Sequence, residues 1–454
     1  MMLTLKDSAM MQLTMARRAM LALCVLAVTA CGGVAQGQGP LITREQAASK
    51  GLERAWFAQV AVDPTRSRVT TWYLYYDAIY SVTDSGVVTA LNSETGEQLW
   101  ARQVGKPGHP AFGPGANNER LGIVSGAKLY VLNRKTGRLE WVRELGSAPS
   151  SGPALSSKFA FVALMTGRIE GYDLLDPVTQ PWYYQSSGRT FLRPTVTGRV
   201  VSWPTNNGIL YVGRADKPGI LFRLETNGDI VTSPAQKSPY LYITSLDGYL
   251  YCVHELTGVE KWRYSTGYSI TSSPAVVDKT AFVASFEPAL HAVDAETGDG
   301  KWIANGVSHF TAMGKERVYA SDQRGNLLIL ESATGRSVGR LPVAEGTTTL
   351  VNYQTDRIFL VNERGLVQCL HEIGVSTPTM YSEPVAPPLP PGAEKAAADD
   401  QENPFGEEEA EAEPAAEDMP AGEPDAFGGE DAEETDDAAP ADDEPMNDNP
   451  FEDF

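Results

Sequence analysis

The sequence is poor in the residues that form metal centres and nucleophilic sites. Its 454 residues include four cysteines and five histidines, and no two histidines stand at a spacing typical of a metal site. It contains no glycine-rich phosphate-binding loop and no His-Glu-x-x-His motif. We therefore predict no catalytic, cofactor-binding or metal-ligating residue and expect no cofactor.

The sequence also has fewer basic than acidic residues, and the excess of acidic residues is concentrated in one part of the chain. The chain has 37 lysine and arginine residues against 58 aspartate and glutamate residues, which gives a net charge of −21. Residues 391–454 contain 25 of those acids and one basic residue, Lys395. The chain before this tail is close to neutral, which disfavours nucleic acid and an anionic membrane surface as partners.

Long apolar runs are absent except near the N-terminus. Residues 19–28 form an apolar run behind Arg17 and Arg18. This run is too short to span a bilayer stably and has the length found in a signal peptide. No other run approaches the roughly 18 apolar residues of a membrane-spanning helix. We therefore expect the chain to be exported.

The end of this run resembles the lipobox of bacterial lipoprotein precursors. Residues 28–31 read Val-Thr-Ala-Cys, and the resemblance implies a signal peptide over residues 1–30 and a lipid anchor on Cys31. Several acyl chains on one cysteine would hold the protein firmly at a membrane. The alternative is ordinary cleavage after Ala35, which would leave a soluble periplasmic or secreted protein.

A unit of about 40 residues repeats along the chain. Each clear copy has an alternating strand, a turn that begins with Asn or Asp, a Thr-Gly pair and a second strand that carries tryptophan. The clear copies are residues 84–100, 129–141, 247–262 and 290–302, and the weaker ones are residues 167–182, 219–228, 325–335 and 365–371. Eight copies with four short strands each predict an all-β, eight-bladed β-propeller over residues 51–373, after a linker of residues 31–50.

The ends of the repeat array predict how the ring closes. The eighth copy stops at His371 without a Thr-Gly pair or a tryptophan, whereas residues 55–60 match residues 99–104. We expect this N-terminal strand to complete the last blade, so that no sheet edge is left at the seam. Buried indoles remove a large area from water, so the repeated tryptophans are predicted to dock neighbouring blades. They are Trp56, Trp100, Trp141, Trp182, Trp262 and Trp302.

Alignment of the copies assigns structural roles to residues that could otherwise be reactive. Cys252 and Cys369 share one position of blades five and eight, which is too far apart for a disulfide. Both are predicted to be buried free thiols. His254 and His371 share the turn position that Asp294 holds in blade six, so we predict a turn hydrogen bond for each.

Two parts of the chain depart from the repeat. The fourth copy has an insertion at residues 214–218 and a shortened last strand without tryptophan, which marks either a binding face or sequence drift. Residues 374–454 are rich in proline and acidic residues and are predicted to be disordered. Their phenylalanines, in residues 403–406, 425–428 and 449–452, are either docking motifs or incidental parts of a solubilising tether.

The repeat resembles that of the pyrroloquinoline-quinone-type propeller family. Residues 292–302 follow its signature, Ala-x-Asp-x-x-Thr-Gly-x-x-x-Trp, and the resemblance covers residues 52 to about 372. It implies either a periplasmic dehydrogenase with quinone and calcium or a non-enzymatic outer-membrane assembly lipoprotein of the BamB type. The dehydrogenases commonly carry adjacent cysteines, which this sequence lacks.

We therefore expect a non-enzymatic, monomeric propeller, lipid-anchored on the periplasmic side of the cell envelope, with the outer membrane as its expected location. The expected partners are envelope proteins, including the β-barrel assembly machinery, and not nucleic acid. Two alternatives stay open. One is a dehydrogenase that depends on pyrroloquinoline quinone, and the other is a propeller that binds cell-wall glycans or peptides.

Overall fold

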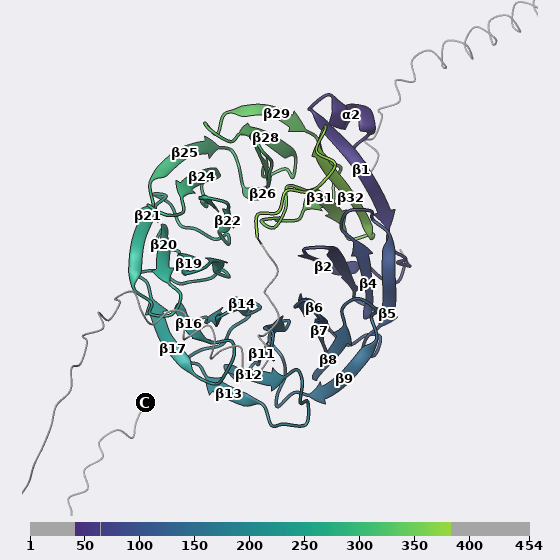
Figure 1. Cartoon of the computed structure of the whole chain (residues 1–454), viewed down its shortest axis with the longest axis vertical. Helices are drawn as coiled ribbons and strands as arrows, with labels where there is room; N and C mark the ends of the chain where they lie inside the picture. The colour runs from purple at the N-terminus through teal and green to yellow at the C-terminus, as the bar shows by residue number, and fades with distance from the viewer. Residues whose placement is uncertain (1–40, 64, 383–454) are drawn as a thin grey trace, which may run out of the picture. The chain divides into compact units, whose positions relative to one another are not determined.

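The structure is a computed structural model that describes residues 41–63 and 65–382. These residues form eight four-stranded antiparallel sheets around a central axis, as Figure 1 shows. The predicted eight-bladed β-propeller is confirmed. The predicted signal peptide, Cys31 and most of the predicted tail lie outside the described residues.

Each blade is a meander whose first strand lies nearest the axis. Blades one to four are β2–β5 (Val69–Tyr75, Ala78–Thr83, Val87–Asn92, Gln98–Gln103), β6–β9 (Ala111–Ala116, Arg120–Ser125, Lys128–Asn133, Leu139–Glu144), β10–β13 (Ala154–Leu155, Phe159–Ala163, Arg168–Asp173, Trp182–Gln185) and β14–β17 (Thr195–Val196, Val200–Pro204, Ile209–Arg214, Ile220–Glu225). Blades five to seven are β18–β21 (Ala235–Lys237, Tyr240–Thr244, Tyr249–His254, Glu260–Ser265), β22–β25 (Ala275–Val277, Thr280–Ala284, Ala289–Asp294, Gly300–Asn305) and β26–β29 (His309–Met313, Arg317–Ser321, Leu327–Glu331, Ser337–Leu341).

The ring closes through the two ends of the described chain. Blade eight consists of β30 (Thr347–Thr349), β31 (Ile358–Asn362), β32 (Leu366–Glu372) and, at its rim, β1 (Leu52–Gln59). β1 pairs antiparallel with β32. The predicted closure by the N-terminal strand is therefore confirmed, and it joins residues more than 300 positions apart into one sheet.

The turn before the last strand explains the Asn-x-x-Thr-Gly pattern. In blade one the side chain of Asn92 accepts hydrogen bonds from the backbone N–H groups of Glu94 and Thr95, at 2.8 and 2.9 Å. Gly96 completes the turn with φ +73°, a left-handed conformation that favours glycine. The pairing of the two outer strands contains a register shift in blades one, two and four to eight.

In blades one, five, six and eight, the tryptophan packs on the Thr-Gly turn of the next blade. A Cβ atom on Gly137 would stand 2.5 Å from the ring of Trp100, and one on Gly335 would stand 2.4 Å from the ring of Trp302. The indole N–H groups of Trp56, Trp100, Trp141 and Trp302 donate to the carbonyls of Ser93, Arg134, Leu174 and Ser332, at 3.2, 2.9, 3.4 and 2.8 Å. The indole therefore occupies the space that a side chain on the turn glycine of the next blade would fill.

Two of the six tryptophans lack this hydrogen bond. The N–H groups of Trp182 and Trp262 have no partner among the described residues. Trp262 still packs against Gly298 of blade six, where an added Cβ would stand 2.7 Å from its ring. Trp182 instead contacts Phe159 and Phe161 of its own blade, with ring centres 6.2 and 5.8 Å away.

Two blades lack tryptophan at this position. In blade four Phe222 pairs with Val212 across the two outer strands, and its ring lies against Gly258 of blade five. Its strand, β17, has six residues, so the sequence-based expectation of a shortened strand is wrong. The tryptophan pattern missed it because a different aromatic residue docks there. In blade seven the position is Gly339, which has no side chain to dock.

A short helix packs against blades seven and eight. Helix α2 (Arg44–Ala48) has a capping box between Thr43 and Gln46. Ile42 and Ala47 are buried in a cluster shared by blades seven and eight, together with Tyr319. The predicted linker of residues 31–50 thus contains a packed helix, and five residues are too few to reveal helical periodicity in the sequence.

The packed chain also extends beyond the predicted start of the tail at residue 374. The N–H of Tyr381 donates to the carbonyl of Gln354 at 2.8 Å. The Tyr381 side chain packs on a cluster of blades six and seven that contains Phe282 and Phe310. Residues 374–382 are therefore part of the propeller rather than of the predicted tail.

Candidate protein-binding surface

The two ends of the ring carry different segments of the chain. Every innermost strand runs in the same direction, because each blade is the same meander. The links between blades and the turns between second and third strands therefore gather at one end, which we call the connection face. In blades three to six it comprises residues 164–167, 186–194, 205–208, 226–234, 245–248, 266–274 and 285–288. The remaining turns form the opposite end, which we call the turn face.

Large apolar side chains are exposed on the connection face of blades three to six. We call them the apolar set: Met165, Phe191, Val231, Tyr268 and Phe286, with exposed fractions of 36, 53, 44, 56 and 73%. Each comes from a different loop, so no apolar run in the sequence marks them. Exposed apolar side chains that gather on one part of a monomer are typical of a protein-binding site.

Backbone hydrogen bonds hold these loops to one another. The N–H of Phe286 donates to the carbonyl of Ser269, and the N–H of Met165 donates to the carbonyl of Ala148, both at 2.8 Å. Each turn is thus tied to the link that precedes its blade. A surface whose backbone is already ordered loses less conformational entropy when a partner binds.

Arg193 anchors the link that carries Phe191. Its guanidinium donates to the carbonyl of Pro114 at 2.6 Å and lies 4.4 Å from the ring centre of Tyr73. Pro114 and Tyr73 belong to the innermost strands of blades two and one. The link between blades three and four is therefore held from across the ring, by a hydrogen bond and a cation–π contact.

Cys252 and Cys369 are both buried free thiols, as predicted. Cys252 lies opposite Trp262, and Cys369 lies opposite Trp56, in the two outer strands of their blades. Burial raises the pKa of the Cys252 thiol to about 12 and also raises that of Cys369. Both thiols are therefore protonated at neutral pH and poor nucleophiles.

The residues present do not fit the quinone and calcium of the dehydrogenases in this repeat family. The two cysteines lie in different blades, so they cannot form the adjacent pair of those enzymes. Across residues 41–63 and 65–382, no three His, Cys, Asp or Glu side chains come together as metal ligands.

The two histidines predicted to hold turns behave differently. Nδ1 of His254 accepts from the N–H of Leu256 at 3.3 Å, which confirms the prediction for blade five. His371 lies in β32, and its Nδ1 contacts the carbonyl of Glu372 at 2.8 Å. The prediction is wrong for His371: the fourth strand of blade eight comes from the other end of the chain, and the turn after β32 is closed by the N–H of Val375, which donates to the carbonyl of Glu372 at 3.1 Å.

His291 gives the propeller a pH dependence that can be measured. It is 4% exposed in β24, with Tyr264 Oη 3.1 Å from its Nδ1, and burial lowers the pKa of its imidazole. Below about pH 6.5 the unfolded chain binds a proton that the folded state resists, so this residue lowers stability as the pH falls from 6.5. In urea unfolding from pH 7.5 to 5, we expect His291→Gln to lose less stability than the wild type.

The matched control is His309→Gln, which changes an exposed histidine of the neighbouring blade. Carboxylates titrate equally in all three proteins, so the comparison isolates the imidazole. An acid-induced loss that is the same in His291→Gln and wild type would contradict the assignment.

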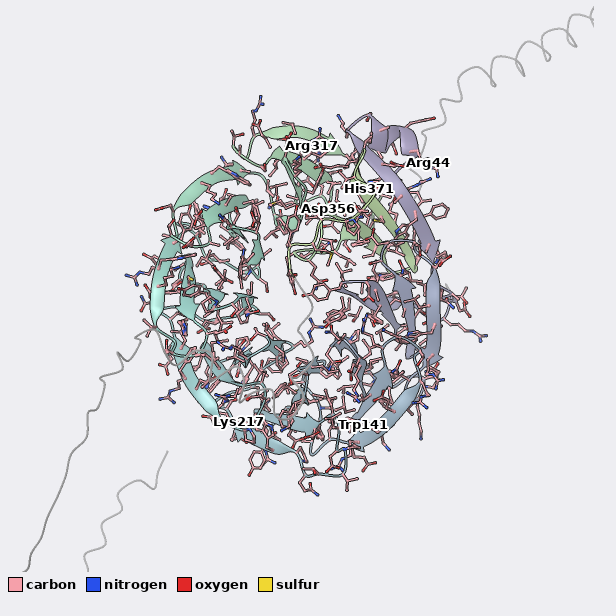
Figure 2. All side chains as sticks on the ribbon, in the orientation of Figure 1. Arg44, Trp141, Lys217, Arg317, Asp356 and His371 are labelled. Atoms are coloured by element: carbon pink, nitrogen blue, oxygen red, sulfur yellow. The ribbon has the colours of Figure 1, made fainter. Side chains whose placement is uncertain are left out.

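No helix in the described ranges is long and apolar enough to cross a bilayer. Figure 2 shows the side chains around the ring, with Trp141 and Lys217 at the rim and Asp356 nearer the axis.

Among solved structures, the propeller is similar to BamB from Moraxella catarrhalis, with a TM-score of 0.55 and 20% identity over 70% of this chain and 99% of that one. It is also similar to the C-terminal WD40 domain of Sif2, with a TM-score of 0.56 and 11% identity over 71% of this chain and 99% of that domain. The designed protein Ika8 matches with a TM-score of 0.54 and 15% identity, over 67% and 96% of the two chains. At these identities the matches show the fold alone.

Sequence comparison is more specific. The curated outer membrane protein assembly factor BamB of Burkholderia pseudomallei is 29% identical over 133 residues, which are 29% of this chain and 32% of that protein. The chain thus matches about a third of that relative's length. The family model described as outer membrane protein assembly factor BamB matches residues 74–177 and 224–368, more than half of the chain. On this evidence the chain belongs to the BamB family of propellers with pyrroloquinoline-quinone-like repeats.

Proposed function

We propose that this protein is a non-enzymatic scaffold of the cell envelope that binds a protein partner through the apolar set on its connection face. The family model and the curated relative are both described as outer membrane protein assembly factors, and we infer that the partner belongs to the machinery that assembles outer-membrane β-barrels. The lipobox-like residues 28–31 support an anchor on Cys31 at the periplasmic side of the outer membrane.

The exposure of the apolar set carries this proposal. Phe286 and Tyr268 leave 73 and 56% of their surface in water, although a propeller of this size has many interfaces in which to bury such rings. Aromatic side chains are enriched at protein interfaces because they bury a large area at a low cost in rotamer entropy. Their placement at the same end of four consecutive blades favours a single partner.

Affinity capture tests the proposal. The full-length protein is used as bait in detergent-solubilised envelope, and recovered β-barrel assembly proteins are quantified by mass spectrometry. We expect the double variant Phe191→Ala, Phe286→Ala to recover at least about tenfold less, since two desolvated aromatic side chains commonly contribute well over 1.4 kcal/mol together.

A matched control comes from the turn face of the same region. The double variant Leu175→Ala, Val178→Ala removes side chains that are 68 and 78% exposed, so it changes apolar exposure at the opposite end. It should recover the partner at the wild-type level. Equal recovery with both double variants, or capture of no β-barrel assembly protein by the wild type, would reject the proposal.

A further inference from the structure

A second surface lies at the turn face, around the axis. Five consecutive blades carry an exposed basic residue in or beside the turn that joins the first strand to the second. We call these residues the basic arc: Lys158, Arg199, Lys237, Lys279 and Lys315. The first strands are the innermost of each blade (Figure 1), so the arc borders the axis over blades three to seven.

These basic residues are far apart in the sequence but occupy similar positions in successive blades. Lys158, Arg199 and Lys279 each stand directly before the second strand of their blade. The corresponding positions of blades one and two hold Asp77 and Glu119. The near-neutral charge of the chain before residue 391 thus hides a basic sector on one end of the ring.

The charges of the arc are available to a partner. None of the five residues forms an ion pair with another described residue. Lys237 donates to the carbonyl of Asp278, and the ammonium of Lys158 lies 5.3 Å from the ring centre of Phe159. These contacts orient two side chains without neutralising them.

We propose that the basic arc binds an acidic, flexible polypeptide segment of a partner protein. Acidic residues interrupt the arc at Asp278 and Glu316, and others are exposed on the outer turns of the same face, at Asp176, Glu296 and Asp299. A flat anionic surface or a nucleic-acid duplex across this face would meet those carboxylates and be repelled. A flexible chain can follow the arc and avoid them.

The residue types agree with this partner. Four of the five are lysines, whose ammonium groups are mobile point charges that pair with carboxylates without the fixed geometry of a guanidinium fork. Together with the apolar set, the arc would let one propeller hold two partners at opposite ends.

Binding of fluorescein-labelled poly-L-glutamate of about 15 residues to the full-length protein tests the proposal. Anisotropy is measured at roughly 50 mM and 500 mM salt, since exposed charges are strongly screened at the higher ionic strength. The arc variant replaces four residues with serine: Lys158→Ser, Arg199→Ser, Lys279→Ser and Lys315→Ser. We expect it to bind about tenfold or more weakly than wild type at the lower salt concentration.

The control variant removes the same charge from the connection face: Arg66→Ser, Lys106→Ser, Arg324→Ser and Arg364→Ser. All eight residues are exposed, so both variants should keep the wild-type thermal midpoint. The control should keep at least half of the wild-type affinity. Equal losses in the two variants, or no binding by the wild type, would overturn the proposal.

Sedimentation with phosphatidylglycerol vesicles distinguishes a membrane from a polypeptide. Loss of vesicle binding in the arc variant, with poly-L-glutamate binding unchanged, would mean that the arc faces lipid and would also overturn the proposal. Neither assay involves the apolar set, so the outcome is independent of the partner that binds the connection face.

Discussion

Replacing Trp100 with alanine is expected to lower the free energy of unfolding by about 3–5 kcal/mol. The indole is 9% exposed, its N–H donates to the carbonyl of Arg134 at 2.9 Å, and its ring lies against Gly137 of the next blade. The glycine turn has no side chain that could move into the cavity, so little of the loss would be recovered. Urea unfolding of the full-length protein, followed by far-ultraviolet circular dichroism, measures the change.

Trp141→Ala is the matched control in the adjacent blade. Trp141 is only partly buried, its N–H reaches the carbonyl of Leu174 at 3.4 Å, and the loop it meets, residues 174–181, contains no glycine. Its removal should cost clearly less than removal of Trp100. Equal losses would mean that burial between an indole and a Thr-Gly turn is not what docks the blades.

Replacing Arg357 with methionine is expected to destabilise the ring by about 3–5 kcal/mol, because it leaves the buried carboxylate of Asp356 without its cation. Arg357 is 1% exposed. Its guanidinium contacts Glu94 of blade one and Asp356 of blade eight, both at 3.1 Å, and donates to the carbonyl of Ser376 at 2.8 Å. One buried cation therefore joins the first blade, the last blade and the segment that follows β32.

A partly exposed ion pair provides the control for Arg357. Arg340 pairs with Asp322 at 2.6 Å, and the two side chains are 49 and 14% exposed. Because Asp322 also accepts hydrogen bonds from Asn326, Arg340→Met should cost only about 0–1 kcal/mol. Raising the salt concentration should change the Arg340 pair more than the buried contacts of Arg357. A loss below about 1 kcal/mol in Arg357→Met would show that the contacts between the first and last blades do not limit stability.

Local sequence pattern was enough to predict the blades. A blade needs only alternating strands, a turn with Asn or Asp and glycine, and a docking aromatic residue, all within one repeat. Closure of the ring could be predicted for the same reason, since residues 55–60 match residues 99–104 and an unpaired strand edge is unfavourable. The tryptophan pattern failed in blade four, because there a different aromatic side chain, Phe222, docks on the turn glycine of the next blade.

The contacts between the first and last blades and the two proposed binding surfaces depend on the tertiary structure. Helix α2, buried Arg357 and the chain to residue 382 pack against elements far away in the sequence, and no local pattern encodes such contacts. The apolar set and the basic arc each draw single residues from loops of several blades. Which of these side chains share a face depends on the direction of the innermost strands around the ring. The sequence alone therefore determined the repeated unit and its closure, whereas the binding surfaces exist only once the blades are placed side by side.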